Sequence, residues 1–103
     1  MTSQERRDFE NRLKGRVTPD GFLVLDARPP LRLAEAGEHA GPALEFGSPG
    51  APPWLRLALV RCGPQAESTS PRFASWCLSD SILVHAGGDR RFIAAVAEGV
   101  ELR

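Results

Sequence analysis

The stretch WLRLALVRCG, which runs from Trp54 to Gly63, is the longest run of strand-like sequence in the chain. Its leucines stand at every second position, so one face of an extended strand would be fully apolar here. Such a strand belongs in the interior of a sheet. It ends at Cys62, because the Gly63-Pro64 pair that follows does not continue strand pairing. We expect this strand to form the centre of the fold, with Cys62 at its carboxyl end.

Shorter segments with helix or strand signals lie on both sides of this stretch. Thr2 and Glu5 form a capping box that begins a helix, and Ser70-Pro71 and Asp89 are residue types that begin two more. Apolar runs bounded by Gly and Pro predict the strands. In chain order we expect a helix over Thr2–Lys14, strands over Phe22–Leu25 and Ala43–Phe46, a segment of undecided type over Leu31–Ala36, a helix over Pro71–Leu78, a strand over Ile82–His85 and a helix between Asp89 and Gly99.

The alternation of short apolar strands with helices predicts the fold class. We expect a single domain over residues 1–103, with an α/β fold in which a small sheet of short, mainly parallel strands is flanked by helices. An alternative stays open for the C-terminal part. If Gly88 and Asp89 form a turn, residues 91–102 return as a strand, and the fold is mostly β with an N-terminal helix and a C-terminal hairpin.

The composition limits the classes of function. The chain has 13 basic and 13 acidic residues, so no net charge favours nucleic acid or an anionic membrane as a partner. The first residues are polar and no apolar run has the length of a membrane span, which predicts a cytoplasmic protein. Two cysteines do not make a disulfide framework, so we expect reduced thiols. Arg is far more frequent than Lys, which indicates a GC-rich, bacterial source.

Metal-ligating residue types are present but not in a metal-binding pattern. Cys62, Cys77, His39 and His85 lack the close pair spacing of zinc sites, so we expect no metal. We expect no cofactor either, because the glycine patterns of phosphate-binding and dinucleotide-binding loops are missing. His39 is expected in an exposed loop, and His85 as a hydrogen-bonded residue of the core.

Cys62 is the candidate reactive residue. A thiol at the carboxyl end of an interior strand, before a loop and a helix, stands where open α/β sheets bind their ligands. Backbone N–H groups and a helix N-terminus stabilise the thiolate, which is the reactive form. The alternative is that Cys62 is a small buried apolar residue without a chemical role.

Four motifs, in order along the chain, resemble those of single-domain rhodanese proteins. Phe22–Arg28, FLVLDAR, is similar to the strand of that family that ends in Asp-x-Arg, and Gly37–Ala43 is similar to its Gly-His segment. Leu59–Cys62 is similar to the strand that leads to the active cysteine. Val84–Gly88, followed by Phe92, is similar to the closing Gly-Gly motif.

The resemblance implies a function and a site. Cys62 would be the catalytic residue of a sulfurtransferase and would carry sulfur as a persulfide. The residues implied to bind the substrate are Gly63, Gln65, Ala66 and Glu67 in the loop after Cys62, together with Arg28. The loop departs from the family at Glu67, where Arg is usual, and a carboxylate there repels an anionic sulfur donor and disfavours the thiolate. We therefore expect a weak or inactive sulfurtransferase.

A second function of a different class stays open. The chain has the size of a non-catalytic protein-binding module, such as an adaptor, a regulator or an inhibitor. An unknown protein partner would then contact Trp54 and the Gly- and Pro-rich segment over residues 37–53. The sequence does not decide between an enzyme and a binding module.

Overall fold

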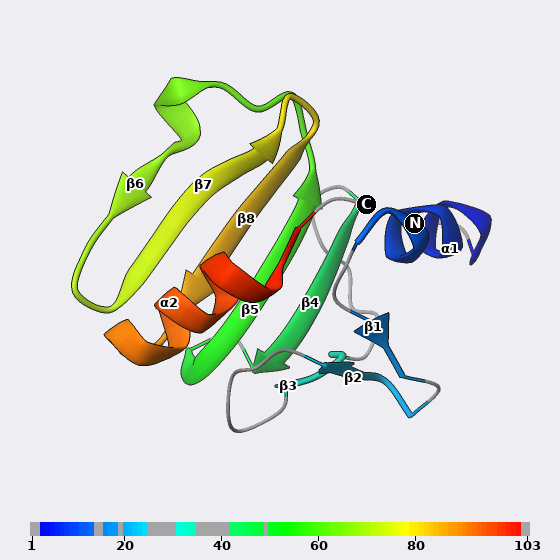
Figure 1. The fold of residues 1–103 in the computed structure, drawn as a ribbon, viewed down its shortest axis with the longest axis horizontal. Coiled ribbons are helices and arrows are strands. Elements are labelled where there is room, and N and C mark those ends of the chain that lie inside the picture. The colour runs from blue at the N-terminus through cyan, green and yellow to red at the C-terminus, as the bar shows by residue number, and fades with distance from the viewer. Residues whose placement is uncertain are drawn as a thin grey trace.

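The computed structural model describes residues 3–13, 16–18, 20–24, 31–34, 42–48 and 50–101 of the chain. Within these residues the chain forms two α-helices, a three-stranded sheet and a five-stranded sheet (Figure 1). A bridge between Leu33 and Phe46 connects the two sheets. Neither helix in the described part is long and apolar enough to cross a membrane.

The larger sheet is antiparallel throughout and carries the candidate site. Its strands are β4 (Ala43–Ser48), β5 (Ala51–Leu59), β6 (Ser68–Thr69), β7 (Phe73–Ser79) and β8 (Ile82–Gly87), in the spatial order β4-β5-β8-β7-β6. β5 pairs along both edges, and its Leu55 and Leu57 are at most 1% exposed. The prediction that Trp54 to Gly63 contains an interior strand is confirmed.

The prediction of mainly parallel strands is wrong. Parallel neighbours need a long crossover connection, which a helix over residues 71–78 would have provided. This segment forms β7 instead, and β7 turns back directly into β8 as a hairpin. The physical reason is its alternation: Ala74 and Trp76 pack against the core, whereas Phe73 is 43% exposed. Burial on a sheet therefore overrides the helix-start signal that Ser70 and Pro71 provide.

The C-terminal segment forms α2 (Arg90–Gly99), as its capping signals predict. The Asp89 carboxylate accepts a hydrogen bond of 2.8 Å from the backbone N–H of Phe92, which satisfies a free donor of the first turn. The alternative of a C-terminal hairpin is therefore wrong. α2 lies across one face of the larger sheet and buries Phe92 and Val96 there (Figure 1).

The core lies between α2 and the sheet face that α2 covers. The register pairs Leu55 with Ala86 and Leu57 with Val84, so these four side chains point to that face. The remaining members of the buried apolar cluster are Phe9, Leu13, Leu31, Leu44, Phe46, Ile82, Phe92, Val96 and Val100.

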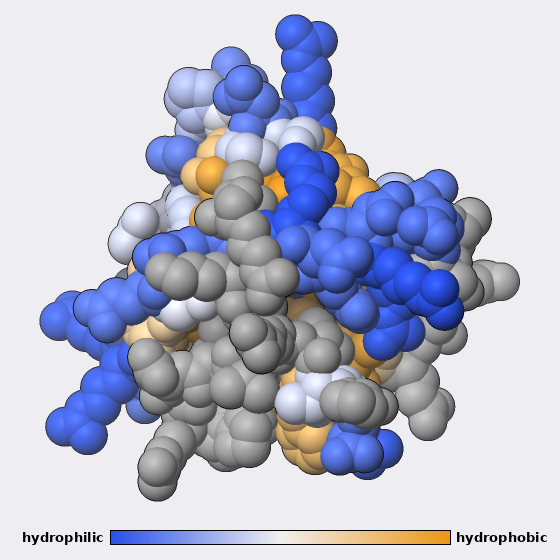
Figure 2. All heavy atoms as spheres, turned by 45° about the vertical axis from the view of Figure 1, so that its right-hand side comes forward, coloured by the Kyte–Doolittle hydropathy of each residue, from blue (hydrophilic) through white to orange (hydrophobic). Residues whose placement is uncertain are grey.

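The N-terminal part of the chain lies beside β4 (Figure 1). α1 (Ser3–Arg12) confirms the predicted helix and adds Phe9 to the core. The smaller sheet consists of β1 (Arg16–Val17), β2 (Phe22–Val24) and β3 (Leu31–Arg32). The segment over Leu31–Ala36, whose type the sequence leaves undecided, therefore begins as a strand. On this side of the molecule, hydrophilic side chains cover most of the coloured surface (Figure 2).

Candidate functional site

The candidate site lies on the face of the larger sheet that points away from α2. Trp54 pairs with Gly87, and Arg56 pairs with His85. Along β5 these two residues alternate with the buried leucines. Because successive side chains on a strand alternate between faces, these residues point away from the core. On the other side of β8, Phe73, Ser75 and Cys77 point to the same face. We call this surface, defined by Glu45, Trp54, Arg56, Phe73, Ser75, Cys77, Leu83 and His85, the second face.

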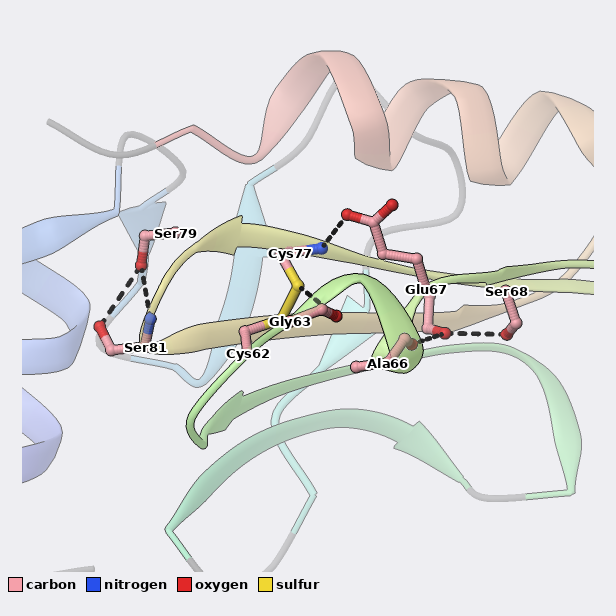
Figure 3. The surroundings of a disulfide bond; sticks show 9 residues. Cys62, Gly63, Ala66, Glu67, Ser68, Cys77, Ser79 and Ser81 are labelled. Atoms are coloured by element: carbon pink, nitrogen blue, oxygen red, sulfur yellow. Dashed lines mark hydrogen bonds between the residues drawn. A yellow bond between two sulfur atoms is a disulfide. The ribbon is translucent and has the colours of Figure 1, made fainter.

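A disulfide bond lies at one end of the second face and joins Cys62 to Cys77 (Figure 3). Cys62 belongs to the loop after β5, and Cys77 belongs to β7, with a Cα–Cα distance of 5.9 Å. These are the two cysteines of the chain, so neither is a free thiol in this structure. The expectation of two reduced thiols is corrected here: antiparallel pairing of β7 brings Cys77 beneath the loop that carries Cys62.

The loop after Cys62 is held against β7 by hydrogen bonds. It includes a short 3-10 turn, η1 (Pro64–Ala66), whose exposed residues include Gln65. The Ser75 hydroxyl donates to the Ala66 carbonyl at 2.8 Å and lies 2.9 Å from the Ser68 hydroxyl. Ser75 is only 9% exposed, so these partners satisfy a buried polar group.

Two oxygen atoms of the loop lie close to Cys77 (Figure 3). The carbonyl oxygen of Gly63 is 3.5 Å from the Cys77 sulfur. The Glu67 carboxylate accepts a hydrogen bond of 3.5 Å from the backbone N–H of Cys77. Glu67 therefore extends the hydrogen bonding of β7 past the end of β6, which is a structural role at the edge of the sheet.

The residues implied by the rhodanese resemblance are only partly brought together. Gly63, Ala66 and Glu67 lie beside the disulfide, but the helix expected to begin behind the loop is absent, since residues 73–79 form β7. Arg28 lies outside the described residues, as does most of the Gly37–Ala43 motif. The catalytic role of Cys62 stays a prediction.

An aromatic cluster lies at the opposite end of the second face. The ring centroids of Trp54 and His85 are 4.7 Å apart, with the planes at 88°. Phe73 contacts His85 from the other side, at 6.1 Å and 82°. Gly87 pairs with both Trp54 and Phe73, and a Cβ on Gly87 would overlap the indole of Trp54. Gly87 thus leaves the space in which the indole packs.

A pocket of about 220 Å³ opens between this cluster and the turn that connects β4 to β5. We call it the Trp54 pocket, and it is lined by Glu45, Phe46, Gly47, Gly50, Trp54, Leu55, Arg56 and His85. Most of its surface is apolar. Its polar wall is the ion pair between the Arg56 Nε and the Glu45 Oε1, at 3.0 Å.

His85 is a titratable residue that lines the Trp54 pocket. Burial, with a smaller contribution from the Arg56 guanidinium, lowers the pKa of His85 below its usual 6.5. Both causes favour the neutral imidazole over the protonated form. The sequence-based interpretation of His85 as a core residue is corrected, because its ring lies on the second face between two aromatic rings.

Sequence reasoning named Trp54 as a contact residue but missed its neighbours. Phe73 falls within the helix predicted over Pro71–Leu78, and no sequence motif singles out Arg56. Both residues alternate with buried residues along their strands, β5 and β7. This alternation shows that they share a face only when the register of the strands is known. Among the described residues no group of three or more metal-ligating side chains comes together, and His39 lies outside them.

Comparisons with models of known protein families, with curated proteins and with solved structures found no match to this chain.

Proposed function

We propose that this chain is a non-catalytic protein-binding module and that the Trp54 pocket receives one side chain of its partner. The observation that carries the proposal is the pocket itself, an apolar hollow beside an indole ring on the sheet face that α2 leaves uncovered. Tryptophan and arginine are also the residue types that most often dominate binding energy at protein interfaces.

The size of the pocket supports a side chain as its occupant. Sites for drug-sized molecules measure about 300–1,000 Å³, whereas this pocket measures about 220 Å³. Gly47 and Gly50 line it without side chains of their own, and a Cβ on Gly50 would have no neighbour within 4 Å. An apolar or aromatic side chain, presented by an extended segment of the partner, has the matching size and polarity.

The pocket wall is held in place before a partner arrives. The Trp54 indole is fixed by His85 on one side and by the backbone of Gly87. The ion pair between Arg56 and Glu45 spans neighbouring strands of the sheet. Binding to such a site loses little side-chain entropy, which favours affinity.

The test is a selection from a random peptide display library on the immobilised wild-type protein, with counter-selection on Trp54→Ala. Selected peptides should share an apolar or aromatic position, and they should lose most of their affinity for Trp54→Ala in titration calorimetry. Val60→Ala removes a side chain that is 41% exposed outside the pocket and should bind normally. Peptides that bind wild type and Trp54→Ala equally, or a selection without enrichment, would contradict the proposal, provided that circular dichroism shows Trp54→Ala to be folded.

The sulfurtransferase function stays a prediction from the resemblance, and no contact described above favours it. It needs a thiolate at Cys62, whose sulfur is bonded to Cys77 in this structure. A thiosulfate–cyanide assay on the reduced wild type and on Cys62→Ala measures it directly.

The cytoplasmic location predicted from the sequence also stays a hypothesis. Disulfide bonds persist mainly in oxidising compartments, so the bond between Cys62 and Cys77 argues against a permanently reduced state. Acid trapping of thiols in intact cells, followed by alkylation and mass spectrometry, determines which state the chain holds.

A further inference from the structure

We propose that Cys62 and Cys77 form a reversible redox site, which exchanges with dithiols and disulfides while the larger sheet stays folded. The co-substrates belong to one chemical class, small-molecule or protein dithiols and their disulfides. The inference is independent of the Trp54 pocket, which lies at the other end of the second face.

The bond lies outside the hydrophobic core. Cys77 pairs with Leu83 on the second face, whereas the buried cluster around Leu57 and Val84 lies on the face covered by α2. Both cysteine residues are partly exposed to solvent. Reduction of the disulfide bond therefore does not separate side chains that contact each other in the core.

Backbone hydrogen bonds hold the two cysteines together without the bond. The N–H of Cys62 donates to the Asp80 carbonyl at 2.8 Å, and the N–H of Val60 donates to the Ser81 carbonyl at 3.1 Å. These contacts tie the start of the loop to the turn between β7 and β8. Farther along, the Ser75 hydroxyl ties the loop to β7 through Ala66. The reduced thiols therefore stay adjacent, which favours closure within one molecule over bonding between molecules.

The surroundings of the two sulfur atoms differ. In the reduced form, the Cys77 thiol can donate its proton to the Gly63 carbonyl, which lies 3.5 Å from the sulfur. The Glu67 carboxylate is bound to the N–H of the same residue. Oxygen atoms on this side disfavour negative charge on Cys77, so Cys62 carries the thiolate and is the attacking sulfur.

The reaction follows from this asymmetry. The Cys62 thiolate attacks one sulfur of an external disulfide, and the second sulfur of that disulfide leaves as a thiolate and is protonated. Cys77 then loses its proton and attacks the Cys62 sulfur, which releases the external group as its second thiol. The external disulfide gains two electrons and two protons, and the protein loses them. Reduction by a dithiol is the same sequence in reverse.

The experiment treats the native full chain with dithiothreitol, traps thiols with N-ethylmaleimide, and measures intact mass. We expect two adducts per chain without denaturant, with the amide resonances of β5 and β8 retained. Oxidised glutathione should then restore the Cys62–Cys77 bond in a monomer. Trapping that requires denaturant, loss of the β5 and β8 resonances on reduction, or intermolecular bonds on reoxidation would each overturn the proposal.

A second measurement tests which sulfur exchanges. In Cys77→Ser, oxidised glutathione should form a mixed disulfide on Cys62 several-fold faster than it does on Cys77 in Cys62→Ser. If either variant is unfolded, limiting iodoacetamide on the reduced wild type gives the same comparison, with Cys62 alkylated first. Equal rates, or faster reaction at Cys77, would refute the assigned roles.

Discussion

Replacing Gly87 by alanine tests the geometry of the Trp54 pocket more directly than removing any side chain. A Cβ at this position would overlap the indole of Trp54, and the overlapping atoms belong to a rigid ring that His85 already confines. Gly87→Ala must therefore push the indole out of place or force the strands apart. Either response changes both stability and the pocket.

The expected magnitude comes from two opposing contributions. Overpacking of this kind costs about 1–3 kcal/mol. Alanine also removes the entropic disadvantage of a glycine inside a strand, which is about 0.5–1 kcal/mol. We expect Gly87→Ala to lower the free energy of unfolding by about 1–2 kcal/mol as the net of these terms. In a Trp54→Ala background there is no indole to overlap with. Gly87→Ala should then raise the free energy of unfolding by about 0.5–1 kcal/mol.

The assay is chemical denaturation of the four proteins of this double-mutant cycle, followed by far-ultraviolet circular dichroism. The sign of the Gly87→Ala effect should reverse when Trp54 is absent, with a coupling energy of about 1.5–3 kcal/mol. Gly63→Ala is the matched control, because a Cβ there has no neighbour within 4 Å, and its effect should stay within about 0.5 kcal/mol. If Gly87→Ala has the same effect in both backgrounds, the indole does not lie where the structure places it.

Three further predictions concern other parts of the fold. Because the bond between Cys62 and Cys77 spans a sequence separation of 15, replacing both by serine should lower the free energy of unfolding by about 2–3 kcal/mol in guanidinium titrations. An unchanged midpoint would contradict a stabilising role of the bond. The His85 imidazole should titrate below 6.5 by nuclear magnetic resonance, and Arg56→Gln should raise its pKa. As pH falls below 6.5, His85 of the unfolded chain is protonated before His85 of the folded chain, so the free energy of unfolding should decrease until the folded imidazole is also protonated. A titration midpoint of His85 at or above 6.5 in the folded protein contradicts this prediction. Asp89→Ala should cost about 1 kcal/mol in thermal unfolding, because α2 loses its cap, and Asp89→Asn, which keeps an acceptor, should cost much less.

The parts of the fold that the sequence predicted are those with local signals. The sequence of α1 begins with a capping box, α2 is capped by Asp89 and buries Phe92 and Val96, and β5 has leucines at every second position, so each carries its own pattern. The segment over residues 71–78 carries two conflicting signals. Ser70 and Pro71 favour a helix start, whereas the alternation that follows fits a strand, and pairing with β8 decides the outcome.

That one segment determined the error in the fold class. With a helix there, β5 and β8 would be parallel neighbours joined by a crossover. With a strand there, β7 and β8 form a hairpin, and β8 pairs antiparallel with β5. Because this segment is a strand and not a helix, Cys77 lies close enough to Cys62 to form the disulfide bond. Neither the disulfide nor the meeting of Phe73 with His85 could be predicted, because both depend on register, and register is set by contacts distant in sequence.

The order of the strands also has a consequence for biosynthesis. β8 is the last strand of the larger sheet along the chain, yet it lies at the centre, between β5 and β7. Before residues 82–87 leave the ribosome, the strands of the larger sheet can pair only as two separate hairpins, β4 with β5 and β6 with β7. Each hairpin has an unpaired edge that β8 later covers. The larger sheet can therefore close only after translation of β8. Until then, the unpaired strand edges of the two hairpins are the kind of edge on which partly folded chains aggregate.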